Sequence, residues 1–315
     1  MNTLIIGGAG FVGSEIVRQW NFKEHGKLII LDKNVGKIST MSISYPNYKF
    51  ISGEASDINL LTTILEENSV SRLIHLAANS DIQGGSETTN PDFQDTLKTT
   101  IALVELLQFY PIKKVYFSST SAVYGQTNEP ISEKKQLIKK PESNYGWAKL
   151  ACEHMLKASS QNNLSDVIIV RFPNVVGPTP THGILFDFKN KLKKNPEFLE
   201  VLGNGTQEKP YIHVFDLTKV LLGMIALENT TSNVSMRYLN IGPGDTITVK
   251  DIVDEVLKIT KLNPKIYWGS TPQGWQGDIA KYSYINEIPL ELSGIQIRNS
   301  STAVRDSFKV AWENE

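Results

Sequence analysis

The sequence contains almost no cysteine. Cys152 is the only one among 315 residues, so no disulfide can form within the chain and no thiolate metal site can be built. We therefore expect no structural metal. A chain without disulfides is typical of a reducing compartment.

Long apolar runs are also missing. No stretch approaches the ~20 residues that a membrane helix requires. The first residues have no basic start and lead straight to Gly7, which is typical of a buried strand rather than a signal peptide. The sequence thus predicts a soluble cytoplasmic protein with no membrane partner.

Charge of either sign is not in excess. Lysine and arginine number 32 against 33 aspartate and glutamate, a formal net charge of −1. A nucleic-acid binder usually carries a basic excess, so no nucleic-acid partner is expected. The apolar and charged fractions, 40% and 21%, are those of an ordinary globular protein, and its length favours two lobes.

Short apolar runs alternate with helical patterns through the first half of the chain. Several runs, such as Leu28-Ile29-Ile30-Leu31, are apolar without alternation, which suits strands covered on both faces. Strand–helix alternation favours an α/β fold with a Rossmann-type, doubly wound parallel sheet. The predicted strands are residues 3–7, 27–32, 48–53, 72–76, 114–118 and 166–171, and the predicted helices are residues 13–20, 57–67, 91–110 and 144–159.

The pattern changes after Arg171, where prolines and glycines shorten the elements. We predict a first lobe over residues 1–171, with a returning segment around 211–241 that includes a helix at 216–228. Residues 172–315 are expected to form mainly a smaller, mixed α/β lobe that binds the substrate.

Three glycines follow the first predicted strand and open a helix. Gly7, Gly10 and Gly13 allow a tight turn, a close approach of the backbone to a pyrophosphate, and close packing of helix on strand. The helix start, with Phe11 and Val12, supplies amide donors to the phosphates. The first lobe is therefore predicted to bind a dinucleotide.

An acid ends the second predicted strand. Asp32 is placed to accept hydrogen bonds from the ribose 2′-OH and to repel a 2′-phosphate, which favours NAD over NADP. Lys33 keeps NADP as an alternative cofactor, because a cation beside the 2′ position attracts the 2′-phosphate. Glu54 and Ala55, after the third strand, are placed to meet the adenine, and Asp57 is expected to cap the next helix.

Tyr145 and Lys149 lie four residues apart at the start of a predicted helix, on one face. An adjacent ammonium favours the phenolate and lowers the pKa of tyrosine. Tyrosinate then takes a hydroxyl proton while hydride moves to a nicotinamide. Upstream, the strand that ends at Ser118-Ser119-Thr120 brings hydroxyl groups to the edge of the sheet where ligands bind.

With these pieces in place, the sequence resembles the extended short-chain dehydrogenase/reductase family, of the NAD-dependent nucleotide-sugar epimerase/dehydratase type that includes UDP-glucose 4-epimerases. The resemblance covers most of the chain. Its matching segments are Gly7–Gly13, Asp32, His75-Leu76-Ala77-Ala78, Ser118-Ser119-Thr120, Val123-Tyr124-Gly125, Tyr145-x-x-x-Lys149, Arg171–Pro178 and, more weakly, Gly203–Asp216.

The resemblance implies a role for each matching residue. Tyr145, Lys149 and Thr120 would be catalytic, with Lys149 also holding the nicotinamide ribose. The remaining implied cofactor contacts are Leu76, Ala77, Ala78 and Ser118, and the implied substrate contacts are Ser80, Asp81, Thr120, Asn174, Lys209 and Tyr211.

The chain departs from the family at three places. Ser121 and Ala122 stand where dehydratases carry an acidic pair, which disfavours a 4,6-dehydratase. Lys209 replaces an arginine and loses its bidentate geometry. Trp275 stands where a second phosphate-binding arginine is expected, so a stacking contact with a base or sugar and plain surface packing are both open.

The resemblance implies oxidation of a ring hydroxyl, at C4, of a nucleoside-diphosphate sugar, followed by reduction on the other face. We expect a 4-epimerase. The alternatives are a net NAD-dependent 4-dehydrogenase that releases the keto sugar, and a non-catalytic NAD-binding regulator.

The long helices at 91–110 and 144–159 suggest an assembly. Leu103, Leu106 and Phe109 extend apolar character beyond a sheet-facing stripe, and Trp147 does so on the second helix. Relatives pair these helices between subunits, so a homodimer or a dimer of dimers is expected. The alternative is that the C-terminal tail, residues 295–312, covers them.

Overall fold

A computed structural model describes residues 1–36, 38, 48–79, 91–110, 112–127, 129–133, 140–162, 166–227, 236–285 and 288–314. Among the helices of these ranges, none has the length and apolar character to cross a membrane.

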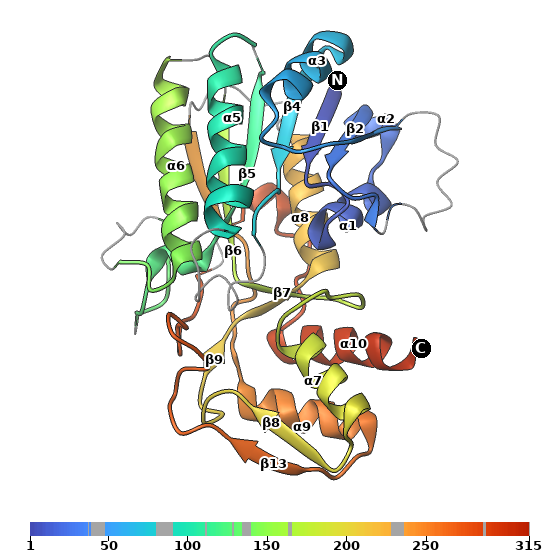
Figure 1. Cartoon of the computed structure of the whole chain (residues 1–315), viewed down its shortest axis with the longest axis vertical. Coiled ribbons are helices and arrows are strands. Elements are labelled where there is room, and N and C mark those ends of the chain that lie inside the picture. Colours follow the sequence, from blue (N-terminus) through green and yellow to red (C-terminus); the bar gives the residue numbers. More distant parts are fainter. Residues whose placement is uncertain are drawn as a thin grey trace.

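The first half of the chain forms most of a seven-stranded parallel sheet (Figure 1). The strand order, β11-β6-β5-β4-β1-β2-β3, runs outward in both directions from β1 and β4, as a doubly wound sheet requires. The predicted fold class is confirmed. Its strands are β1 (Asn2–Ile6), β2 (Lys27–Asp32), β3 (Tyr48–Ser52), β4 (Val70–His75), β5 (Lys114–Thr120), β6 (Asp166–Phe172) and β11 (Met236–Asn240).

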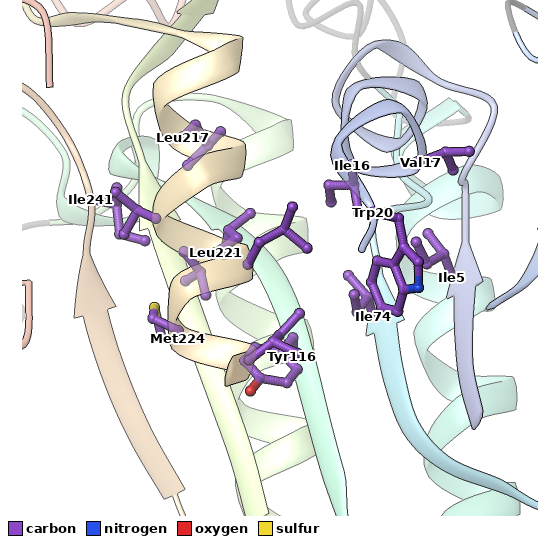
Figure 2. Close-up of a cluster of buried hydrophobic side chains, with 14 of the residues drawn as sticks. Ile5, Ile16, Val17, Trp20, Ile74, Tyr116, Leu217, Leu221, Met224 and Ile241 are labelled. Carbon is purple, nitrogen blue, oxygen red and sulfur yellow. The ribbon is translucent and has the colours of Figure 1, made fainter. Parts of the chain in front are cut away.

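Helices cover both faces of the sheet. One face packs against α1 (Phe11–Gln19), α2 (Phe22–His25) and α8 (Val214–Leu227), and Figure 2 shows Leu217, Leu221 and Met224 of α8 within this layer. The other face packs against α3 (Ile58–Asn68), α5 (Lys98–Leu107) and α6 (Asn144–Asn162). Burial on both faces explains why the central strands lack polar alternation.

The second half of the chain forms the smaller lobe below the sheet in Figure 1. It contains three two-stranded sheets, two parallel and one antiparallel, around an apolar core shared by its helices. Its strands are β7 (Asn174–Val176), β8 (Phe198–Val201), β9 (Glu208–Lys209), β10 (Tyr211–His213), β12 (Ile247–Thr248) and β13 (Lys265–Trp268); its helices are α7 (Ile184–Lys194), α9 (Val249–Thr260) and α10 (Ser300–Glu313). The short helix η4 (Leu290–Leu292) instead packs against α8 of the first lobe.

The chain returns to the first sheet before it ends. Helix α8 packs against α1, and β11 pairs in parallel with β6 as the seventh strand. The helix expected at 216–228 is therefore present as α8. The division into two domains stays a prediction, because the first sheet is built from two separate parts of the chain.

The predicted helix at 91–110 differs from expectation. Its start is a π-turn, η2 (Asp92–Leu97), and only then does α5 begin. Within the regular helix α5, Leu103, Leu106 and Leu107 recur at helical spacing and pack in the molecule's own core, whereas Phe93 and Ile101 are exposed. The expectation that Leu103 and Leu106 face outward was wrong.

The C-terminal tail does not cover α5 and α6. Helix α10 packs against α7, α9 and β10 in the smaller lobe, and Figure 1 shows it on the other side of the molecule from α6. That alternative to self-association is excluded.

Candidate cofactor and active site

The glycine turn lies between the ends of β1 and β4. Gly7 has a φ of +80°, and a Cβ on Gly7 would lie 2.7 Å from the amide nitrogen of Ala77. A Cβ on Gly13 would lie 2.5 Å from the carbonyl oxygen of Gly7. Leu76 and Ala77 both donate to the Ile6 carbonyl. The backbone is thus packed so closely that side chains are excluded at Gly7 and Gly13.

Helix α1 starts at this turn without a side-chain cap. Gly10 is its N-cap and provides no side-chain hydrogen bond, and Phe11 and Val12 form the first turn. Amide groups at a helix start without a polar cap are suited to an anionic phosphate.

Asp32 is fixed at the end of β2. Its Oδ2 accepts from the backbone amide of Ala9 at 2.9 Å, and its Oδ1 accepts from Asn34 at 3.1 Å. The carboxylate therefore lies against the glycine turn. Next to it, the Lys33 ammonium pairs with Asp95 at 2.9 Å, which raises the pKa of Lys33. Asp57 caps α3 by accepting from Leu60, as expected, and Glu54 and Ala55 precede it in the turn after β3.

Tyr145 and Lys149 lie on the first turns of α6, beside the end of β5. The Lys149 side chain is buried, and its Nζ donates to the Ser118 carbonyl at 2.7 Å and lies 3.4 Å from the Ser118 hydroxyl. Tyr145 is half-buried. The pair is therefore held on one face of α6, against the strand that carries Ser118 and Thr120.

Burial controls the ionisation of this pair. It lowers the pKa of Lys149 to about 8. It also raises the pKa of Tyr145, and the negative charge of Asp92 adds to that rise. We expected the neighbouring ammonium to lower the pKa of Tyr145, but in the protein alone the desolvation effect is larger. Tyr145 is therefore a neutral phenol in the protein alone.

Hydroxyl and amide groups extend the site toward the smaller lobe. Thr120 is buried and its Oγ1 accepts from the amide of Ala122 at the start of η3 (Ser121–Tyr124). The Tyr282 hydroxyl accepts from Ser121 at 2.9 Å and from the side-chain amide of Asn174 at 3.4 Å. Tyr282 thus connects the end of β5 with β7.

Lys209 and Tyr211 lie further along the same lobe. The Lys209 ammonium is buried in an ion pair with Asp278 and lies 5.3 Å from the centre of the Trp275 ring. Tyr211 is buried on β10, directly paired with Asn174 of β7. The Trp275 ring thus covers a cation that Asp278 already neutralises. Of the two roles considered for Trp275, this contact favours packing over stacking on a substrate.

Comparison with known proteins gives the family. The model of the "NAD dependent epimerase/dehydratase family" matches residues 3–242. The chain belongs to this family. A UDP-glucose 4-epimerase of Halalkalibacterium halodurans is 28% identical over 82% of this chain and 80% of its own length. A dTDP-D-glucose 4,6-dehydratase of Dictyostelium discoideum is 27% identical over 82% of this chain and 62% of its own length.

A solved structure agrees with the family assignment. The crystal structure of a UDP-galactose 4-epimerase superimposes with a TM-score of 0.83 at 27% identity and covers 98% of both chains. This confirms the resemblance and the fold. The chain is therefore an enzyme of the NAD-dependent epimerase/dehydratase family.

The geometry fits the cofactor of this family, NAD. The glycine turn leaves no room for side chains where a pyrophosphate approaches, and Asp32 is fixed where a ribose hydroxyl can donate to it. Lys33, which left NADP open, is paired with Asp95. The predicted cofactor is thus confirmed at the level of the family, while the role of each contact residue stays a prediction.

Two predicted substrate residues, Ser80 and Asp81, lie outside the described residues. Conversely, the sequence analysis missed Tyr282, Asp278, Asp92 and Glu153. Glu153 follows Lys149 by four residues, so helical spacing gave a usable signal for it. Tyr282 and Asp278 come from an irregular segment, where no periodicity predicts which side chains turn inward.

Among the described residues, no group of three or more His, Cys, Asp or Glu side chains is placed to hold a metal ion. His75 is buried on β4 against Phe117, and burial together with the nearby Lys149 charge lowers its pKa to about 3. It is therefore a neutral residue of the core.

Proposed function

We propose that the protein is a 4-epimerase of a nucleoside-diphosphate sugar. The observation that carries this proposal is the arrangement of Tyr145, Lys149 and Thr120 at the carboxyl end of β5, at the same edge of the sheet as the glycine turn after β1. Two of the relatives and structures described above are themselves named as 4-epimerases of UDP-linked hexoses.

In the proposed reaction, Tyr145 is the base that removes the proton of the sugar hydroxyl. Thr120 accepts from Ala122 through its oxygen, so its hydroxyl hydrogen is available to hold the sugar oxygen in line with Tyr145. Lys149 keeps its ammonium at Ser118, where it offsets the developing phenolate. NAD, when bound, supplies the hydride acceptor and a positively charged ring.

Dehydration is disfavoured as the second half of the reaction. Removal of water from C5 and C6 needs an acid and a base near those atoms. At the two positions after Thr120 the chain has Ser121, whose hydroxyl donates to Tyr282, and Ala122. An epimerase instead needs the keto sugar to turn and take the hydride back on its other face.

The deciding experiment is incubation of the NAD-loaded protein with a panel of UDP- and dTDP-linked hexoses. We expect conversion of one sugar to its 4-epimer without net NADH, measured by NMR of the products and by NADH absorbance. Stoichiometric NADH with a keto sugar would identify a dehydrogenase, and a 4-keto-6-deoxy product a dehydratase. No turnover of any sugar would favour the regulator.

A further inference from the structure

A buried carboxylate near the catalytic pair has no assigned role. Asp92, the first residue of η2, is only 3% exposed. Its Oδ1 accepts from the side-chain amide of Asn79 at 3.0 Å, and Oδ2 has no hydrogen-bond partner in the described part of the chain. Among the described residues its one polar contact is with a neutral amide. Burial of a carboxylate without a paired cation costs free energy, so a role for this carboxylate is to be sought.

Two elements fix the position of Asp92. Asn79 follows β4, and its backbone amide donates to the Thr96 hydroxyl of η2 at 3.0 Å. Helix α6 packs on η2, where the Cys152 thiol lies 3.7 Å from the Thr96 carbonyl. The π-turn, a local departure that is frequent at functional sites, thus holds Asp92 between the loop after β4 and the helix that carries Tyr145 and Lys149.

The buried Lys149 ammonium lacks a direct ionic partner among the described residues, because its two acceptors both belong to Ser118. The other titratable groups around it are unable to balance its charge. His75 is neutral, and burial raises the pKa of the Cys152 thiol, so that the thiol is uncharged near neutral pH. Tyr145 is protonated in the protein alone.

The remaining acids near Lys149 are Glu153 and Asp92. Both oxygens of Glu153 bind the Arg171 guanidinium, at 2.9 and 2.5 Å, so its charge is already balanced. Asp92 has no such cation in contact. The two uncompensated buried charges in this part of the molecule, Asp92 and Lys149, therefore have opposite signs and lie near each other.

We propose that Asp92 is a positioning residue of the catalytic pair, whose carboxylate is the counter-charge that keeps the buried Lys149 ammonium protonated. The inference rests on the proposed function only in giving Tyr145 and Lys149 the proton transfer. The effect of Asp92 on Lys149 itself is a property of the folded protein.

Two consequences have a definite sign. Loss of the Asp92 charge lowers the pKa of Lys149 further below its ordinary value, because one of the groups that opposes the effect of burial is removed. Lys149 then becomes a neutral amine within the physiological pH range. A neutral amine is unable to stabilise the tyrosinate, so the high-pH limb of activity moves to lower pH. Loss of the same charge also lowers the pKa of Tyr145, so the low-pH limb, which the base sets, moves to lower pH as well.

The test measures the protonation of Lys149 directly. Protein carrying 13Cε-lysine and bound NAD is titrated by NMR, and the Lys149 signal is identified as the one absent from Lys149→Met. We expect Asp92→Asn to move the midpoint of Lys149 down by about one pH unit. Asp92→Glu, which keeps the charge, should stay close to the unchanged protein.

The matched control is Asp95→Asn. Asp95 lies on the same π-turn, but its carboxylate pairs with the exposed Lys33, so the midpoint of Lys149 should stay unchanged. If Asp92→Asn does not fold, Asp92→Ser, which also removes the charge, replaces it and should again lower the midpoint of Lys149.

The midpoint decides the inference. An unchanged midpoint in folded Asp92→Asn, or in Asp92→Ser where that variant is used, overturns it. With a substrate in hand, the high-pH limb of kcat should move down with the midpoint while KM stays the same. A shifted midpoint in a protein that converts no sugar would refute the proposed function and leave the role of Asp92 intact. Turnover of a sugar with an unchanged Lys149 midpoint would support the proposed function and refute the role of Asp92.

Discussion

At the residue scale, Asp32 is the side chain that we expect to select the cofactor. Both of its oxygens accept backbone amides, so the carboxylate is held against the glycine turn rather than free to move aside. A 2′-phosphate brought to this position would meet a fixed negative charge. We therefore expect the protein to bind NAD more tightly than NADP. Asp32→Ala should reduce this difference in affinity, which calorimetric titration of both cofactors measures.

Lys33 provides the control for this measurement. Since its ammonium is already paired with Asp95, Lys33→Ala is expected to leave the preference for NAD largely unchanged. Equal affinities for the two cofactors in the unchanged protein would refute the assignment to Asp32.

Tyr145→Phe tests the base. The variant loses the hydroxyl that takes the proton but keeps the ring that packs at the start of α6, so folding and NAD binding should persist. We expect kcat to fall by at least ~100-fold, the lower range for general acid–base catalysis. Circular dichroism and NAD titration serve as controls, and an unchanged kcat would show that Tyr145 is not the base.

Single residues also mark the limit of the sequence analysis. The placement of Gly7, Asp32, Tyr145 and Lys149 in the fold was predictable because each has a fixed spacing from a strand or from its partner, while their roles stay predictions. The ionisation of Tyr145 was not, because desolvation depends on what covers the ring. Asp92 was missed because its burial follows from a π-turn, and the sequence pattern gives no sign of that turn.

At the scale of elements, one buried ion pair ties α6 to the sheet. Glu153 of α6 binds Arg171 of β6 at two points and accepts from the Ser119 hydroxyl of β5 at 2.5 Å. Removal of one partner leaves an uncompensated charge inside the protein. Glu153→Gln should therefore lower the free energy of unfolding by about 3–5 kcal/mol, measured by urea denaturation.

A surface ion pair serves as the control for Glu153→Gln. Glu67 of α3 pairs with Lys49 of β3 at 3.2 Å, with both side chains more than half exposed. Glu67→Gln should cost less than about 1 kcal/mol. Similar losses for the two variants would mean that the Glu153–Arg171 pair does not stabilise the fold as proposed.

The elements themselves were largely predictable where apolar runs are continuous. β2 spans the predicted residues, and the ends of the other five predicted strands agree within two residues. The helix at 91–110 was predicted, but not the side of it that faces the core. Apolar residues lie around much of α5, so periodicity alone did not show that Leu103 and Leu106 are buried and Ile101 is exposed.

For the whole molecule, the open question with a clear test is self-association. Four apolar side chains are exposed here: Phe93 of η2, Ile101 of α5, Phe109 just after α5, and Trp147 of α6. Helices α5 and α6 stand side by side in Figure 1, outside the sheet. Exposed apolar groups on two neighbouring helices favour an interface, so we still predict a homodimer or a dimer of dimers.

Light scattering at micromolar concentration measures the mass. The unchanged protein should give a multiple of the 35.1 kDa chain, and Trp147→Glu, which places a charge in the interface, should lower it. Val310→Glu is the control, since Val310 is a similarly exposed apolar residue on α10 in the smaller lobe. A monomeric mass for the unchanged protein would end the prediction of a dimer.

The late arrival of β11 has a consequence for synthesis on the ribosome. Until Asn240 has emerged, β6 presents an unpaired edge, and the face that α8 covers lacks part of its apolar layer. The ribosome must therefore synthesise all residues from β7 to β10 before the seventh strand of the first sheet can pair. Unpaired strand edges and exposed apolar faces promote aggregation. We therefore expect the nascent chain to need chaperones most while the segment between β6 and the end of β11 is being translated.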